Sequence, residues 1–186
     1  AALLETLREA KGIPFTGSGY VSHVIGLNKP IAKALFSSCE IPTPRFSVFH
    51  RTRDFPQGID EFNLRFPVLV KPASEGSSIG ISPESVCNSL EELKEVASTV
   101  IAEYGNAVVV EEFLPGREFT VGVLGNEEPE VLPVEEIIFT EGSNIYSHQV
   151  KLRDAIIPSC PAKIGRELER ELSRLALKVY RTVGCL

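Results

Sequence analysis

Lys71 is the first residue of this chain whose position indicates chemistry. It directly follows the apolar run at residues 66–70, which is most simply a buried strand. An unpaired ammonium group in such a place is costly, so Lys71 needs an anionic partner. The next segment, residues 75–80 (EGSSIG), offers backbone N–H groups, hydroxyls and glycines that let a ligand approach closely. This combination predicts a phosphate-binding loop, although the GxxxxGK[ST] order of a Walker loop is absent. The alternative is a structural turn in which Lys71 pairs with Glu75 or Glu111.

A second candidate site lies at residues 108–118 (VVVEEFLPGRE), where an apolar strand ends in two carboxylates, an aromatic residue and a Pro-Gly turn. Such a segment can form a hinge between two lobes. Its backbone groups can bind the edge of a flat heterocycle while Phe113 and Leu114 cover the face. Glu118 could accept hydrogen bonds from a sugar diol. The alternative is an ordinary hairpin with solvated glutamates.

The elements that must position these residues are both helical and extended. Apolar spacing predicts a first helix at residues 3–10, a helix that begins near Asn28, and a last helix that Gly184 can end. Ser89 and Glu92 form a capping box before an amphipathic helix of about four turns. We expect strands at 46–50, 66–70, 79–82, 107–114, 118–124 and 131–139. The pattern predicts an α+β fold of two small lobes with antiparallel sheets that meet near residue 112.

Composition excludes several classes of protein. Of the 186 residues, 43% are hydrophobic and 24% charged, which argues against disorder and against a fibrous protein. The formal charge of −6 argues against a nonspecific nucleic-acid binder. We find no apolar run long enough to span a membrane and no signal peptide. Four cysteines without a CxxC pair and three scattered histidines predict reduced thiols in a cytoplasmic protein and no Cys/His metal site.

The order of these motifs resembles the D-alanine–D-alanine ligase family of the ATP-grasp superfamily. The likeness covers essentially the whole chain. Its two specific stretches are Phe66–Gly80 (FPVLVKPASEGSSIG) and Val110–Gly125 (VEEFLPGREFTVGVLG). Further matching stretches are residues 12–19, 28–29, 132–137, 146–151 and 160–162.

The resemblance implies a role for each matching residue. Lys29 and Lys71 match the lysines that hold the ATP phosphates, and Ser77 matches a loop serine that helps to orient the first substrate. Lys151 matches the phosphate-contacting lysine of a mobile loop that closes over the site. The remaining matches are at the adenine-binding hinge and the ribose contact: Glu111, Glu112, Phe113, Leu114 and, for the ribose, Glu118. Such ligases phosphorylate one D-alanine with ATP, and the amine of a second D-alanine then attacks the acyl phosphate.

The resemblance also implies a domain organisation. Residues 1–18 would be the tail of an N-terminal substrate domain, 19–112 the central ATP-grasp lobe, and 113–186 part of the C-terminal lobe. Lysines alone do not fully neutralise the negative charge of the transferring phosphate, so Mg²⁺ is expected. The family's metal-binding carboxylates and its catalytic arginine lie downstream of the last helix. The absence of Met and the start at Ala1-Ala2 suggest an excised piece, which we expect to be inactive alone.

Two departures from the family bear on the substrate. Leu152 stands where these enzymes usually carry a loop tyrosine, and Gln149 replaces a familiar glutamate. These changes leave open a related ligase for another amino or hydroxy acid. The alternative that is not an enzyme is a nucleotide-binding module without catalytic activity. The expected partners are ATP and D-alanine, with neither nucleic acid nor membrane, and the family leads us to expect a homodimer.

Overall fold

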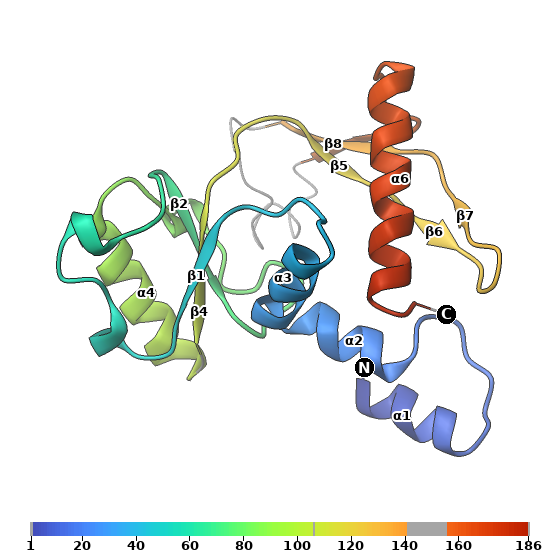
Figure 1. Ribbon diagram of the computed structural model, residues 1–186, viewed down its shortest axis with the longest axis horizontal. Coiled ribbons are helices and arrows are strands. Elements are labelled where there is room, and N and C mark those ends of the chain that lie inside the picture. The colour runs from blue at the N-terminus through green and yellow to red at the C-terminus, as the bar shows by residue number, and fades with distance from the viewer. Residues whose placement is uncertain (1, 106, 141–155, 186) are drawn as a thin grey trace. The chain divides into compact units, whose positions relative to one another are not determined.

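A computed structural model describes residues 2–105, 107–140 and 156–185 (Figure 1). The chain divides into two compact units. Unit 1 comprises Ala1–Pro42, Arg117–Ile138 and Ile157–Leu186, and unit 2 comprises Thr43–Gly116 and Phe139–Ile156. Both units combine helices with antiparallel strands, in agreement with the predicted α+β class.

Unit 2 is built on a four-stranded antiparallel sheet in the order β1-β4-β2-β3. Its elements are β1 (Phe46–Phe49), β2 (Val68–Pro72), β3 (Val86–Cys87), β4 (Val108–Glu112), helix α4 (Leu90–Tyr104) and short 3-10 turns at Thr52–Asp54, Ile59–Glu61 and Pro83–Ser85. Helix α4 covers one face of this sheet (Figure 1). The predicted strands at 46–50 and 66–70 and most of the one at 107–114 are therefore confirmed, each with shifted ends.

Alternation along the two central strands divides their side chains between the two faces of the sheet. Val68, Val70, Val108 and Val110 are fully buried and belong to the core under α4. The other members of this core are Phe55, Phe62, Leu64, Cys87, Leu90, Leu93, Ala97 and Val100. Burial raises the pKa of the Cys87 thiol to about 11, with a smaller contribution from Glu92. The intervening residues of β2 and β4 lie on the opposite face, and Lys71 is one of them.

The start of α4 follows the predicted capping signal. The Ser89 side chain accepts a hydrogen bond from the Glu92 N–H at 3.2 Å. The Glu92 carboxylate in turn accepts from the Asn88 N–H at 2.7 Å, one residue before the expected partner. Gly105 ends the helix with a φ of +63°, a left-handed conformation that favours glycine.

Unit 1 combines a three-stranded sheet with a two-stranded hairpin and four helices among its described residues. The sheet has the order β5-β8-β9, and β6 pairs with β7. The bounds are α1 (Ala2–Ala10), α2 (Tyr20–Leu27), α3 (Lys29–Ser38), β5 (Glu118–Thr120), β6 (Val123–Leu124), β7 (Glu130–Val131), β8 (Glu135–Phe139), β9 (Ile156–Ser159) and α6 (Arg166–Thr182). Tyr180 of α6 donates to the Gly125 carbonyl, and Ser22 Oγ lies 2.8–2.9 Å from the carbonyls of Val183 and Gly184. These contacts join α6 to the hairpin and to α2.

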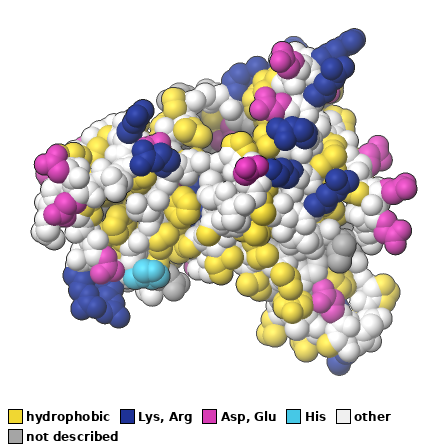
Figure 2. All heavy atoms as spheres, in the orientation of Figure 1, with side chains coloured by type: hydrophobic (Ala, Val, Ile, Leu, Met, Phe, Trp, Pro, Cys, Tyr) yellow, Lys and Arg dark blue, Asp and Glu magenta, His cyan; other side chains and the backbone are white. Residues whose placement is uncertain are grey.

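Apolar side chains gather on the surface of α1 and α2 (Figure 2). The exposed ones are Leu3, Leu4, Leu7, Tyr20, Val21, Val24 and Leu27. Helix α2 itself was not among the predicted elements. No helix within the described ranges has the length and apolar character needed to cross a membrane.

Three strand predictions need correction. Residues 79–82 form no strand, because they leave a tight turn at Ser77-Ser78 and lead into the 3-10 turn at Pro83. The single strands expected at 118–124 and 131–139 are each interrupted. Pro133 lies in the second interruption, and proline cannot donate to a sheet ladder.

Candidate functional site

Lys71 pairs with Glu111 on the face of the unit 2 sheet that is opposite α4. Its Nζ donates to Glu111 Oε1 across the β2–β4 pair. In the register Lys71 lies opposite Val109, so Glu111 is the diagonal neighbour on the same face. The Lys71 side chain is 22% exposed and that of Glu111 11%. The structure thus contains one of the two ion pairs expected from the structural alternative, and this pair joins the two predicted motifs.

The loop after Lys71 contains a tight turn centred on two serines. Ser77 and Ser78 have φ values of +53° and +58°, and the Ile79 N–H donates to the Gly76 carbonyl at 2.9 Å. Non-glycine residues with positive φ are uncommon and cost about 1–3 kcal/mol each. Such strain is concentrated at functional sites. The exposed Ser77, the predicted substrate contact, therefore occupies a backbone conformation that the surrounding structure must enforce.

Gly80 has a packing role that the sequence did not indicate. Its φ is +74°, and a Cβ at this position would lie 2.5 Å from the Pro72 ring and 3.0 Å from the ring of Tyr104. The sequence suggested that glycines of this loop let a ligand approach closely. At Gly80 the close neighbours are instead two rings of the protein, so this glycine fixes the loop against β2 and α4.

The predicted hinge begins at the end of β4. Glu112 accepts a hydrogen bond from the Arg65 N–H at 3.0 Å, and its own N–H donates to the Arg45 carbonyl at 3.0 Å. The Phe113 N–H donates in the opposite direction, to the Pro67 carbonyl at 2.9 Å. These bonds hold the extended backbone between two neighbouring segments. Leu114 follows with a side chain that is 66% exposed, so its apolar surface is accessible.

The other predicted contacts belong to unit 1 or lie outside the described residues. Lys29 is the first residue of α3, whose Asn28 side chain accepts from the Ile31 N–H at 3.1 Å, as the predicted N-cap requires. Glu118 is the first residue of β5 and is exposed. Lys151, with Gln149 and Leu152, lies outside the described residues.

Sequence reasoning missed an ion pair beside Glu118. Arg117 Nε and Nη2 donate to the two carboxylate oxygens of Glu136, each at 2.6 Å. Arg117 Nη2 also donates to the Lys163 carbonyl at 3.1 Å, and the guanidinium carbon lies 5.0 Å from the centre of the Phe119 ring. The hydrogen bonds lower the pKa of Glu136 and raise that of Arg117. The available signal was the pair of opposite charges at two predicted strands, Arg117 just before residues 118–124 and Glu136 within residues 131–139.

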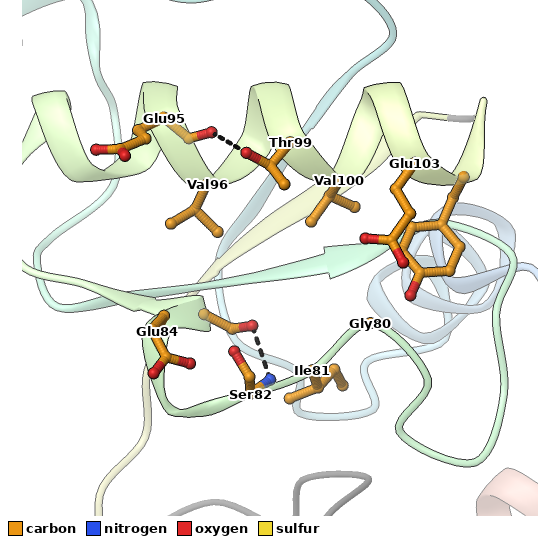
Figure 3. A pocket seen from close by; sticks show the side chains of 11 residues that line it. Gly80, Ile81, Ser82, Glu84, Glu95, Val96, Thr99, Val100 and Glu103 are labelled. Carbon is orange, nitrogen blue, oxygen red and sulfur yellow. Dashed lines mark hydrogen bonds between the residues drawn. The ribbon is translucent and has the colours of Figure 1, made fainter.

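A groove of about 410 Å³ lies in unit 2 between α4 and the segment at residues 80–85 (Figure 3). Val96 and Val100 point from α4 toward this segment, and Glu95 and Glu103 lie along the same helix. A hydrogen bond with Ser82 lowers the pKa of Glu84 on the other side of the groove. Lys71, Ser77 and the hinge residues do not line it. The groove therefore meets the predicted phosphate-binding loop at Gly80 and is otherwise lined by other residues.

The described residues contain no cluster of three metal-ligating side chains. Within residues 2–105, 107–140 and 156–185, no three His, Cys, Asp or Glu side chains gather closely enough to hold a metal ion. Mg²⁺ is usually held by one or two carboxylates together with water and phosphate oxygens.

Solved structures and curated sequences resemble this chain over nearly its whole length. The crystal structure of VanG D-Ala:D-Ser ligase from Enterococcus faecalis matches 99% of the chain and 52% of its own, with a TM-score of 0.81 and 29% identity. The D-alanine-D-alanine ligase from Coxiella burnetii shares the fold, with a TM-score of 0.78 and 20% identity over 99% of this chain and 47% of its own. These matches and the antiparallel sheets confirm the predicted α+β ATP-grasp fold.

The sequence comparisons define the family. The family model described as D-ala D-ala ligase C-terminus matches residues 35–186. D-alanine–D-alanine ligase from Cupriavidus pinatubonensis is 33% identical over 183 residues, which are 98% of this chain and 54% of that protein. The ligase from Bacillus velezensis is 34% identical over 97% of this chain and 51% of its own length. The chain belongs to the D-alanine–D-alanine ligase family, and it spans about half the length of the curated relatives it matches.

Proposed function

We propose that this chain is the nucleotide-binding part of an ADP-forming ligase that joins two D-alanines for peptidoglycan synthesis. The observation that carries the proposal is the similarity to D-alanine–D-alanine ligases over 98% of the chain, a length that includes both predicted motifs. The strand register supports it, because it places the phosphate-binding motif at the end of β2 beside the hinge motif at the end of β4 within one sheet.

The proposed reaction has two steps. A carboxylate oxygen of the first D-alanine attacks the γ-phosphorus of ATP, and the bond between that phosphorus and the β,γ-bridging oxygen breaks to release ADP. The amine of the second D-alanine then attacks the acyl carbon, loses a proton and displaces inorganic phosphate. Phosphoryl transfer of this kind depends on positioning and on stabilisation of the negative charge. The lysines of this chain would supply part of that stabilisation.

Each predicted residue has a role in this proposal. Lys29, Lys71 and Lys151 contact phosphate oxygens of ATP, and Ser77 helps to orient the first D-alanine. The backbone of Glu111–Leu114 binds the edge of adenine, while the side chains of Phe113 and Leu114 cover its face. Glu118 accepts hydrogen bonds from the ribose hydroxyls. The strained turn at Ser77 supports its role, because a backbone conformation of this cost is retained where function needs it.

The remaining proposals concern the whole protein. When bound, Mg²⁺ would supply further neutralisation of the phosphate charge. We propose a cytoplasmic location, because ATP and both amino acids are small molecules of the cell interior, and a homodimer, because the family leads us to expect one. The domain division at residues 18 and 112 belongs to the same proposal.

Purified whole protein with ATP, Mg²⁺ and D-alanine tests the function. We expect ADP formation that requires D-alanine, together with a dipeptide of two D-alanines identified by mass spectrometry. D-serine and D-lactate, offered as second substrates beside D-alanine, should give less product. If ADP forms only when D-serine or D-lactate is added, the assignment of D-alanine as the second substrate is wrong. If no ADP forms with any of them, ligase activity itself is contradicted.

A further inference from the structure

We propose that Arg117 and Glu136 form a clamp that positions Glu118 for recognition of the ribose of ATP. This inference rests on the proposed function, in which Glu118 accepts hydrogen bonds from the ribose hydroxyls. Arg117 and Glu136 themselves do not contact the nucleotide in this proposal. They act through the backbone of β5, and they are therefore positioning residues.

Glu118 begins a short strand. Strand β5 contains three residues, and within the part of the chain that the structure describes it lies at the edge of its sheet beside β8. The register pairs Glu118 with Ile137, Phe119 with Glu136 and Thr120 with Glu135. Edge positions and strand ends open more readily than the centre of a sheet. Additional contacts beside such a strand limit its opening and so help to keep its first residue in position.

The clamp supplies these contacts on the face opposite the Glu118 side chain. Arg117 and Phe119 are two residues apart and share one face of the strand, and the register places Glu136 directly beside Phe119 on that face. The 5.0 Å distance between the Arg117 guanidinium carbon and the Phe119 ring centre agrees with this arrangement. The Glu118 side chain therefore lies on the other face, where it does not compete with Arg117 for Glu136.

Three chain segments meet at the guanidinium of Arg117. It holds β8 through two hydrogen bonds of 2.6 Å to Glu136, and it holds the segment before α6 through the Lys163 carbonyl at 3.1 Å. The Ala162 N–H donates to the Val134 carbonyl at 2.7 Å, which ties that same segment to the start of β8. A planar guanidinium with two parallel bonds fixes direction as well as distance. The backbone just before Glu118 is therefore fixed in both position and orientation.

The test uses the whole protein and compares ATP with 2′-deoxy-ATP and 3′-deoxy-ATP. We expect the wild type to prefer ATP at least tenfold in kcat/KM over one of these analogues, as the loss of a charge-assisted hydrogen bond predicts. Glu118→Gln should abolish most of this preference. Arg117→Ala should also abolish most of it, through a higher KM for ATP with kcat changed less than threefold. The double variant should lose no more preference than Glu118→Gln alone.

Two variants separate a positioning role from a general loss of structure. Arg117→Lys keeps the charge but not the parallel pair of bonds, so we expect intermediate discrimination. Arg170→Ala removes an exposed arginine of α6 in the same unit and should leave the preference for ATP unchanged. The kcat/KM for 3′-deoxy-ATP or 2′-deoxy-ATP, whichever analogue has lost the contact, should change little in Arg117→Ala.

The outcomes distinguish this inference from the proposed function. If Glu118→Gln keeps the wild-type preference for ATP, the proposed ribose contact is wrong. If Glu118→Gln loses the preference and Arg117→Ala keeps it, the clamp does not position Glu118. Equal losses of kcat/KM for ATP and both analogues in Arg117→Ala would also overturn the clamp, because a purely structural role predicts that result.

Discussion

Two ion pairs of this chain join neighbouring strands in different compact units, and they differ in burial and geometry. Lys71 and Glu111 in unit 2 are 22% and 11% exposed and make one contact through Nζ. Arg117 and Glu136 in unit 1 are 49% and 13% exposed and make two parallel hydrogen bonds, with a third from Arg117 to a carbonyl. The first pair has the more desolvated cation, and the second has the more directional hydrogen-bond geometry.

This difference suggests that the two cations have different roles. A lysine ammonium is a point charge on a flexible stem, so it can exchange one oxygen partner for another without a fixed approach direction. Such a cation suits contact with a phosphate that arrives and leaves. A guanidinium with two parallel bonds is directional, and its exposed charge is screened by solvent. Such a guanidinium is better suited to holding backbone segments in place than to binding a ligand.

Removal of the buried cation should have the largest effect. Lys71→Met keeps most of the side-chain volume but removes the Lys71 partner of Glu111, and loss of one member of a buried pair is costly. Because the pair is partly exposed, we expect the free energy of unfolding to fall by about 2 kcal/mol, below the range for full burial. In the whole protein, ATP affinity should fall at least tenfold, since a charge-assisted hydrogen bond contributes about 1.5–3 kcal/mol.

Urea unfolding followed by circular dichroism measures the stability, and calorimetric titration measures ATP binding. Lys71→Met combined with Glu111→Leu should be at least about 1 kcal/mol more stable than the sum of the single changes predicts. Lys11→Met removes an exposed lysine and should stay within about 0.5 kcal/mol of the wild type. Strict additivity in the double variant would contradict a coupled Lys71–Glu111 pair, and unchanged ATP affinity in Lys71→Met would contradict the proposed phosphate contact.

The buried core of unit 2 should make the chain sensitive to alkaline pH. The pKa of Cys87 is raised from 9.0 to about 11 by burial, so the folded state keeps the thiol protonated after the unfolded state has lost its proton. This contribution to stability is complete below pH 9 and is lost as the pH rises toward 11. At about 1.4 kcal/mol for each pH unit, the loss attributable to Cys87 amounts to roughly 2–3 kcal/mol.

The Cys87→Ala variant isolates this contribution from lysine and tyrosine ionisation. We expect the variant to be less stable than the wild type at pH 7, because it leaves a small cavity, and the difference should shrink between pH 9 and 11. Urea unfolding midpoints at several pH values give the comparison. A constant difference across this range would mean that the thiol ionises as readily in the folded state as in the unfolded state.

Sequence patterns predicted the features of this fold that depend on local signals. The apolar run before Lys71 became a central strand, and Ser89 caps the start of the long helix. Patterns of this kind report burial and capping, which act within a few residues. The motifs also placed Lys71 and Glu111 as candidates, and the register then brought both onto one face. The proposed roles in ligand binding stay predictions.

The features that sequence reasoning missed depend on contacts between distant segments. The strand expected at residues 79–82 had suitable residues, but Ser77 and Ser78 adopt positive φ and turn the chain away from an extended path. No propensity rule predicts two serines in that conformation. The Arg117–Glu136 pair was missed because its bonds join residues 19 positions apart. Strand boundaries alone do not fix a register.

Acid should weaken the exposed Arg117–Glu136 pair, and salt should weaken it more than the buried Lys71–Glu111 pair; these are the smallest effects we predict. The pKa of Glu136 is lowered by its hydrogen bonds with Arg117, so its contribution to stability is present above pH 4.5 and is lost as the pH falls through the lowered folded-state value. The stability gap between the wild type and Glu136→Gln should therefore be widest near neutral pH and narrow on acidification.

The stability gap between the wild type and Glu136→Gln should also narrow at about 1 M NaCl, where the Debye length falls to about 3 Å. The gap for Lys71→Met should change less with salt, because a desolvated pair is screened less. Urea unfolding of these three proteins at low and high salt measures both gaps. An equal response of the two gaps to salt would contradict the distinction between the exchangeable lysine and the arginine clamp.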